Sequence, residues 1–313
     1  MVGRILVPLD GSPLAAAAVP YAATLARALD APIGLLAVVE SFPDRPGVPS
    51  DDAIAGDDRR VAASAAHLDA VAATLRATDL VIGTALRHGN PASAILAPAS
   101  EILAEAEGAE GVLLVMSTHG RTGLERLRRG SVAPQVLRHS GTPTLVIPPC
   151  QGASTEGRSA ISEVTITLDG SPLAEEALPL ATQLAAALAV PLTLLQVISS
   201  LPAPEGWGTG YGGCYPITPD LEREEGHAIA DDLEAVAVPL RAPDRTVLTC
   251  WRRSTTAQAG ECIATYLAER PMGLAVTASH GRGGVLRWAL GSTAEYVLDR
   301  APCPILIVRA GSS

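Results

Sequence analysis

The sequence of 313 residues contains no lysine, so that all 23 residues counted as Lys or Arg are arginine. This absence excludes a Walker-type loop, in which a lysine contacts the phosphates of a bound nucleotide. A phosphate group could therefore be held only by backbone amides, hydroxyl groups, arginine or a metal ion.

The low content of aromatic residues, the lack of excess basic charge and the lack of paired cysteines exclude further classes of protein. Hydrophobic residues make up 48% of the chain, yet its only aromatic residues are one phenylalanine, three tryptophans and five tyrosines, so the core must be built from Ala, Val, Leu and Ile. The net charge of −10 argues against sequence-independent nucleic-acid binding, which needs a basic surface. The five cysteines are scattered and form no C-x-x-C pair, which indicates neither a zinc ribbon nor a disulfide framework.

Long apolar segments are also lacking. None reaches the roughly 18 residues that a membrane span requires, and the N-terminus leads into a predicted strand without a secretory signal pattern. We therefore expect a cytoplasmic protein without a membrane contact.

The chain is an internal duplication. The segment Leu9–Ala15 recurs letter for letter as Leu168–Ala174, and a second set of matches follows in the same order, in which residues 118–121 and 130–131 correspond to 279–282 and 291–292. A repeat of this length is a whole domain. The sequence predicts a first domain over residues 1–150, a linker rich in Gly, Ser and Thr over 151–160, and a second domain over 161–313.

In both halves short apolar runs alternate with longer helical patterns, which predicts an α/β fold of two tandem doubly wound domains with mostly parallel sheets. The expected strands are Arg4–Leu9, Pro32–Glu40, Leu80–Arg87, Gly111–Ser117, Thr144–Ile147, Glu163–Leu168, Pro191–Ile198, Thr246–Trp251, Gly273–Thr277 and Pro304–Val308. The expected helices are Pro13–Leu29, Asp58–Ala77, Pro91–Glu107, Ser131–Ser140, Pro172–Leu188, Asp220–Ala237, Thr256–Arg270 and Ser292–Arg300. The longest expected loops are Ser41–Asp57 and Ser199–Pro219.

Ligands of such sheets bind beyond the carboxyl ends of the strands. Asp10 and Asp169 end the first strand of each half, while Val38 and Val197 lie near the end of the second strand. A carboxylate at this edge suits a hard cation such as Mg²⁺. Capping of the following helix is the alternative role, and the sequence leaves both open.

A glycine-rich loop leads from the fourth strand of each half into a helix, over Gly120–Ser131 and Gly281–Ser292. Its glycines allow close approach to an anion, and the following helix adds amide groups and, at Ser131 or Ser292, a capping hydroxyl. Glycine and serine are also ordinary turn and cap residues. Nine residues separate the two outer glycines in both loops, whereas a simple connection uses about two to six, which favours a bound ligand.

These residues resemble the universal stress protein family over nearly the whole of both halves. The family signature is Gly, two residues, Gly, nine residues, Gly, and then Ser or Thr. The two matching segments are Ser117-x-x-Gly120-x9-Gly130-Ser131 and Ala278-x-x-Gly281-x9-Gly291-Ser292. The strand ending Val7–Ser12, the segment Gly89–Ala92 and the closing run Thr142–Ile147 also fit the family.

The resemblance implies five-stranded sheets in the order 3-2-1-4-5, as in adenine-nucleotide alpha-hydrolase-like folds, and an ATP site in each half. Adenine would lie against the backbone of the second strand and the phosphates in the glycine loop. For the first half the implied residues are Pro8, Asp10, Val38, Ser117, His119, Gly120, Arg121, Thr122, Gly123, Gly130, Ser131 and Val132. For the second half they are Thr167, Asp169, Val197, Ala278, His280, Gly281, Arg282, Gly283, Gly284, Gly291, Ser292 and Thr293.

The chain departs from the signature at its first glycine, which is Ser117 in one half and Ala278 in the other. If that position needs a positive φ, both residues strain it. If it needs only a small side chain, both are acceptable, and their size favours this second alternative.

Three hypotheses about function follow. The first is a stress-response binding module that holds ATP, with or without Mg²⁺, and catalyses no reaction or a slow one, because no lysine neutralises the γ-phosphate and no base is placed for water. The second is a slow ATPase or nucleotide transferase. The third is the same fold without nucleotide, acting through dimer surfaces. The resemblance also implies pairing through the last strands, within the chain as a pseudo-dimer or between chains as a homodimer.

Overall fold

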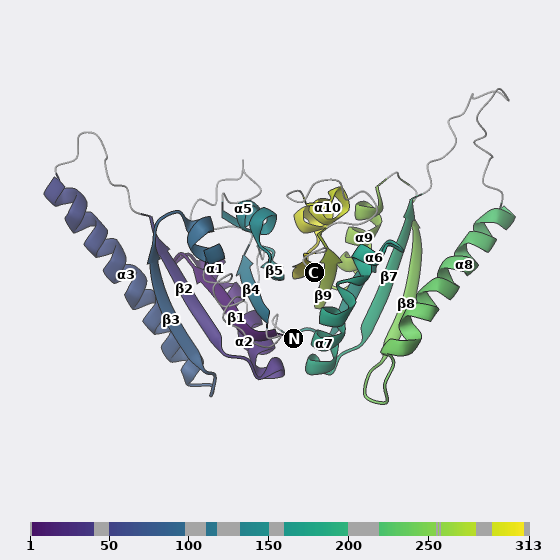
Figure 1. Cartoon of the computed structure of the whole chain (residues 1–313), viewed down its shortest axis with the longest axis horizontal. Coiled ribbons are helices and arrows are strands. Elements are labelled where there is room, and N and C mark those ends of the chain that lie inside the picture. Colours follow the sequence, from purple (N-terminus) through teal and green to yellow (C-terminus); the bar gives the residue numbers. More distant parts are fainter. Residues whose placement is uncertain are drawn as a thin grey trace, which may run out of the picture.

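The ten strands of the structure, a computed structural model, form one continuous sheet (Figure 1). The structure describes residues 2–40, 50–97, 111–117, 132–149, 160–199, 219–254, 256, 258–279 and 290–309. Within these residues the strands are β1 (Val2–Leu9), β2 (Ile33–Val39), β3 (Ile82–His88), β4 (Gly111–Ser117), β5 (Thr144–Ile147), β6 (Glu163–Leu168), β7 (Leu192–Ser199), β8 (Val247–Ser254), β9 (Gly273–Ala278) and β10 (Ile305–Val308).

The strand order β3-β2-β1-β4-β5-β10-β9-β6-β7-β8 contains the order 3-2-1-4-5 twice, in mirror sequence about its centre. Pairing is parallel within each half, and β5 pairs with β10 in the antiparallel sense, with Leu145 opposite Leu306. The predicted strand order and the predicted pairing of the two halves through their last strands are therefore confirmed. The pairing covers two sheet edges that would otherwise expose unpaired backbone groups.

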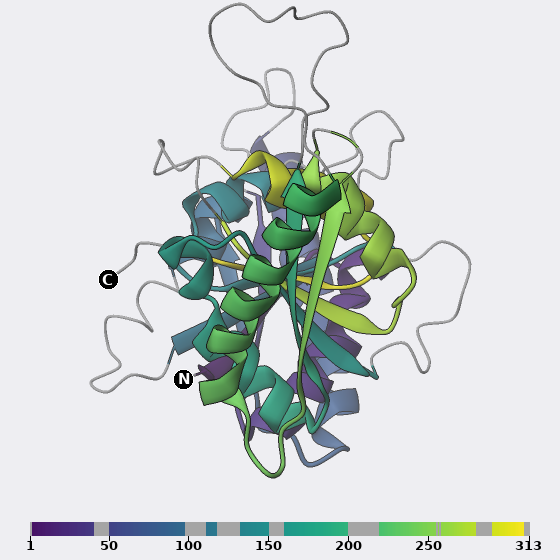
Figure 2. The ribbon, with the colours of Figure 1, turned by 90° about the vertical axis from the view of Figure 1, so that its right-hand side faces the viewer.

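Helices cover both faces of the sheet. One face carries α2 (Ala18–Leu29), α3 (Ser50–Arg76), α7 (Leu178–Leu188) and α8 (Pro219–Ala237), whose buried side chains belong to one cluster that continues across both halves. The other face carries helical residues 91–97 and α5 (Val132–His139) in the first half, and α9 (Ala259–Ala268) and α10 (Ser292–Arg300) in the second. Figure 2 shows α8 running beside the outer strand β8.

Two predicted helices, Pro13–Leu29 and Pro172–Leu188, are each broken in two. The first consists of α1 (Pro13–Ala16) and α2, and the second of α6 (Pro172–Glu175) and α7. Pro20 and Pro179 explain the breaks, because proline has no N–H to donate to the carbonyl four residues earlier and its ring crowds that carbonyl.

The predicted loop Ser41–Asp57 is wrong over its second part, because α3 begins at Ser50. The sequence Ser50-Asp51-Asp52 directly after a proline is typical of a helix start, and acidic residues in a first turn interact favourably with the helix dipole. Of the helix predicted over Pro91–Glu107, residues 91–97 are helical, and the remainder lies outside the described residues. In the described part of the chain no helix combines the length and the apolar character needed to cross a bilayer.

Close packing of α9 on α10 depends on Gly260. A Cβ atom at this position would lie 2.8 Å from the Cβ of Tyr296, which is attached to the helix backbone and cannot swing away. We expect Gly260→Ala to lower the free energy of unfolding by about 1–3 kcal/mol, although alanine is the better helix former. Urea unfolding measures the change. Gly83→Ala in β3, where a Cβ would meet nothing within 4 Å, is the control, and a Gly260→Ala protein as stable as wild type would contradict the packing.

Candidate functional site

The repeated Asp-Gly-Ser-Pro segment forms the same turn after the first strand of each half. Gly11 and Gly170 have φ values of 79° and 75°, a conformation that favours glycine. Ser12 accepts a hydrogen bond from the amide of Ala15 at 3.0 Å and so caps α1, which begins with proline. The turn alone therefore accounts for these small residues, without a ligand.

Asp10 and Asp169 order this turn and do not cap the helix. Oδ1 of Asp10 accepts the amide of Ser12 at 2.9 Å, and Oδ1 of Asp169 accepts the amide of Ser171 at 3.0 Å. Asp169 also accepts the Ser171 hydroxyl at 2.6 Å. The N-cap of α1 is Ser12, so the capping role that the sequence left open for Asp10 is filled by the serine two residues later.

The strand register brings three of the predicted site residues of the first half to one edge. Leu9 pairs with Ala37, so Asp10 follows at the level of Val38. Leu6 pairs with Leu114, so three residues later the end of β1 lies level with Ser117. Neighbouring strands are about 4.8 Å apart. The aspartate, the second-strand valine and Ser117, the last residue of β4, are thus adjacent.

The second half repeats this arrangement. Leu168 pairs with Gln196, which brings Asp169 level with Val197, and Thr167 pairs with Thr277, which brings the end of β6 beside Ala278. The buried hydroxyl of Thr167 contacts the Val276 carbonyl oxygen at 3.5 Å. Both halves therefore present the same three positions at the carboxyl edge of the sheet, where ligands of doubly wound folds bind.

Ser117 and Ala278 do not strain the backbone at the first position of the signature. They are the last residues of β4 and β9 and pair with Ile147 and Val308. The described non-glycine residues with positive φ are Asp30, Asp79 and Ala189. In this structure the position needs only a small side chain, as the size of the two residues favoured.

The second glycine loop ends at a hydrogen bond within the protein. The amide of Gly291 donates to the Ser279 carbonyl oxygen at 2.8 Å, which closes the base of the loop. Gly291 is the N-cap of α10, so the expectation that Ser292 caps this helix is wrong, and Ser292 is the first helical residue. The amide of Gly291 is therefore already used by the protein, and any anion here would rely on other amides.

Pro8 and Val132 are half-buried around the first site, and Thr293 is half-buried in the first turn of α10. The remaining predicted loop residues lie outside the described residues, and they are His119, Gly120, Arg121, Thr122, Gly123, Gly130, Ser131, His280, Gly281, Arg282, Gly283 and Gly284.

A divalent cation at either edge would have the carboxylate of one predicted ligand, Asp10 in the first half or Asp169 in the second. Among the residues that the structure describes, His, Cys, Asp and Glu side chains form no group of three or more that could hold a metal. The aspartate at each edge suits Mg²⁺ as a single ligand, a coordination that Mg²⁺ completes with phosphate oxygens and water.

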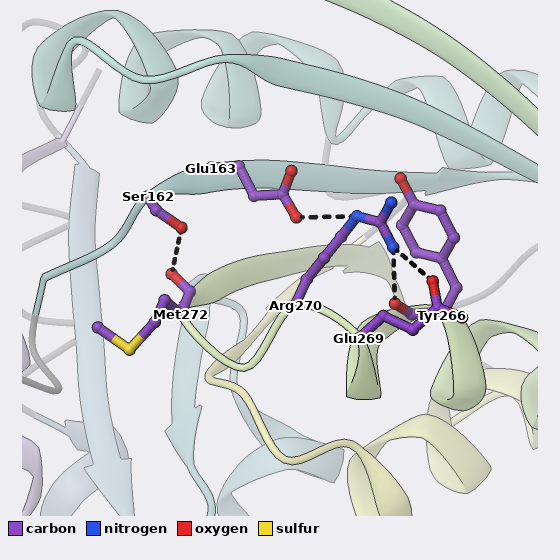
Figure 3. A network of polar contacts seen from close by, with 6 residues as sticks. All are labelled: Ser162, Glu163, Tyr266, Glu269, Arg270 and Met272. Atoms are coloured by element: carbon purple, nitrogen blue, oxygen red, sulfur yellow. Dashed lines mark hydrogen bonds and ion pairs between the residues drawn. The ribbon is translucent and has the colours of Figure 1, made fainter.

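Sequence reasoning missed a polar cluster at the opposite end of β6 (Figure 3). Nε of Arg270 lies 3.3 Å from Oε1 of Glu163, and its guanidinium lies 3.8 Å from the centre of the Tyr266 ring. Arg270 also contacts Glu269 and the Tyr266 carbonyl oxygen at 3.1 Å each. The cluster joins the start of β6 to the end of α9, away from the carboxyl edge. Glu163 is too far from the other three residues in sequence for a recognisable motif.

Burial raises the pKa of the Glu163 carboxyl above its usual range, and the neighbouring Arg270 guanidinium opposes the shift. A raised folded-state pKa contributes stability at acid pH that is lost as the pH rises through that value. We therefore expect the free energy of unfolding of Glu163→Gln, relative to wild type, to increase as the pH goes from about 4 to about 7. Urea titrations across this range measure the difference. Glu269→Gln, which alters a more exposed contact of the same arginine, is the control, and a pH-independent difference for Glu163→Gln would contradict the prediction.

Comparison with known proteins agrees with this architecture. A model of the Universal stress protein family matches residues 1–148 and again residues 161–309. Over 97% of this chain and 96% of each relative, the sequence is 27% identical to a universal stress protein of Mycobacterium tuberculosis and 30% identical to one of Mycolicibacterium smegmatis. The crystal structure of a universal stress protein from Archaeoglobus fulgidus is similar in fold, with a TM-score of 0.68 over 98% of both chains at 18% identity. The chain therefore belongs to the universal stress protein family and contains two domains of its fold, joined into one sheet.

Proposed function

We propose that this protein is a stress-response binding module in which each domain holds an adenine nucleotide, ATP in the first instance, at the carboxyl edge of its half of the sheet. The observation that carries the proposal is the register, which puts an aspartate, a second-strand valine and the last residue of the fourth strand side by side in both halves. In a single half, a turn without a ligand would explain this arrangement. Its repetition, with loops of equal length, favours a ligand.

In this proposal the base lies against the backbone at Val38 or Val197, and the phosphates are held by the amides of the glycine loop and of the first turn of the following helix. Asp10 and Asp169 would each supply one carboxylate oxygen to a Mg²⁺ ion that the phosphates share. We also propose that the two domains extend over residues 1–150 and 161–313, and that the protein is located in the cytoplasm.

Chemistry on the nucleotide would be absent or slow. Phosphoryl transfer depends on cations that neutralise the transferred group, and the chain has no lysine to do so. Timed product analysis separates binding from a slow ATPase or nucleotide transferase, because turnover that Asp10→Ala abolishes would favour catalysis.

Isothermal titration of the full chain with Mg-ATP tests binding. The proposal expects saturation below millimolar nucleotide, and no measurable heat at millimolar nucleotide would contradict it. The variant Ser117→Gly with Ala278→Gly tests the third hypothesis, a fold that has lost its nucleotide. If the glycines create affinity that the natural chain lacks, the protein acts through its surfaces alone. If both proteins bind equally, the small side chains are sufficient.

A further inference from the structure

The two halves are not equivalent at the helix that follows the glycine loop. Nη1 of Arg309, directly after β10, donates a hydrogen bond to the carbonyl oxygen of Arg138 at 2.8 Å. Arg138 is in the last turn of α5, where carbonyl groups have no partner within the helix and a cation interacts favourably with the helix dipole. The second half of the chain thus holds the C-terminal end of a first-half helix.

The sequence forbids the reciprocal contact. The residue that directly follows β5, in the position that Arg309 has after β10, is Pro148. Proline has neither a side-chain donor nor a backbone N–H. Of these two equivalent described positions, the one after β10 has a side-chain donor and the one after β5 has none.

Packing ties α5 to the second half as well. Its residue Leu137 is 7% exposed and belongs to the buried cluster of the second half, together with Leu298 and Ile305, whereas Ala133 and Val136 belong to the first-half cluster. A helix of eight residues is marginal on its own, so contacts at one end affect the whole of it.

A backbone hydrogen bond connects the neighbour of Arg309 to the second site. The amide of Ser279, at the base of the second glycine loop, donates to the carbonyl oxygen of Val308 at 2.7 Å, and the next residue is Arg309. Contacts therefore run from Ser279, at the base of the second glycine loop, through Val308 and Arg309 to Arg138 at the end of α5.

We propose that Arg309 is a positioning residue for the first nucleotide site, acting through α5, and that the second site has no counterpart. The inference rests on the proposed function, in which the amide of Val132 at the start of α5 contacts phosphate. The first site then depends on the second domain through a contact that Pro148 does not make for the second site.

The test uses Arg309→Met in the full chain, which keeps the side-chain stem and removes the donors. It is combined with Asp169→Ala, which leaves the first site, or with Asp10→Ala, which leaves the second. Titration with Mg-ATP should show affinity weakened roughly two- to fivefold at the first site. The second site should be unchanged. Arg59→Met, which removes the same charge from an exposed position on α3, is the matched control for both backgrounds.

Hydrogen exchange of the ligand-free protein supplies a readout that does not need nucleotide. In Arg309→Met the amides of α5 should exchange faster, and those of α10 should not. Unchanged exchange in α5, or equal loss of affinity at both sites, overturns the positioning role of Arg309. A different outcome is faster exchange in α5 together with no Mg-ATP binding by the parent Asp169→Ala and Asp10→Ala chains. That outcome would contradict the proposed function, and with it the role of Arg309 at the first site.

Discussion

Replacing Leu306 with alanine should lower the free energy of unfolding by about 2–5 kcal/mol. Leu306 is fully buried in β10, lies opposite Leu145 of β5, and belongs to the cluster that continues through both halves. Truncation leaves a cavity at the seam between the two domains, where neighbouring strands cannot move inward without breaking the sheet. Because one sheet joins the halves, we also expect both to be destabilised together.

Leu248→Ala is the matched control for this experiment. The same side chain is removed from β8, where it is 49% exposed, so the loss should be well under that at Leu306. Urea or thermal unfolding measures both variants. A Leu306→Ala protein that unfolds like Leu248→Ala would show that the β5–β10 seam contributes little to stability.

The double variant Asp10→Ala with Asp169→Ala should weaken Mg-ATP binding by roughly 10- to 100-fold at each site, because each change removes a charged group with a hydrogen bond. Part of the loss would come from the turn, since each aspartate accepts the amide of the serine two residues later. Titration calorimetry provides the affinities.

Asparagine at the same two positions separates the two contributions. Asp10→Asn and Asp169→Asn keep an oxygen that can accept the serine amide but remove the charge. If the carboxylate holds Mg²⁺, the asparagine variants should bind as weakly as the alanine variants. If it only orders the turn, they should bind like wild type. Asp58→Ala on α3 is the control for a general loss of negative charge. If the double-alanine protein binds Mg-ATP with wild-type affinity, neither Asp10 nor Asp169 has a role at the site.

Local patterns in the sequence were enough to predict the strands of this fold. Gly111–Ser117, Thr144–Ile147 and Glu163–Leu168 have the bounds that the sequence predicts, because each is a short apolar run between turn residues. Long helices were less well predicted. The apolar period of Pro13–Leu29 continues across Pro20, and only the missing N–H at that residue breaks the helix.

Long-range features were beyond the reach of local patterns. The antiparallel pairing of β5 with β10 followed from the family resemblance, since nothing in Thr144–Ile147 itself indicates its partner. The bond between Arg309 and Arg138 spans 171 positions, and the ion pair of Arg270 with Glu163 depends on how α9 meets β6. Such contacts are set by tertiary packing, which a period of apolar residues does not specify.

For the candidate site, the sequence predicted that Asp10, Val38 and the glycine loop meet at one edge, because the carboxyl ends of parallel strands lie there. The register brings Asp10 and Val38 to that edge beside Ser117, and the loop itself lies outside the described residues. The sequence predicted the bounds of α10 correctly but assigned the N-cap to Ser292 instead of Gly291, whose amide donates to the Ser279 carbonyl oxygen. That bond joins residues on either side of a long loop, so no local pattern reveals it.

Native mass spectrometry of the full chain at saturating Mg-ATP tests the central proposal most directly, because it counts bound nucleotides. The account predicts two nucleotides per chain, and mainly one in Asp10→Ala and in Asp169→Ala at the nucleotide concentration that just saturates the wild type. A full chain that carries no nucleotide at saturation would contradict it.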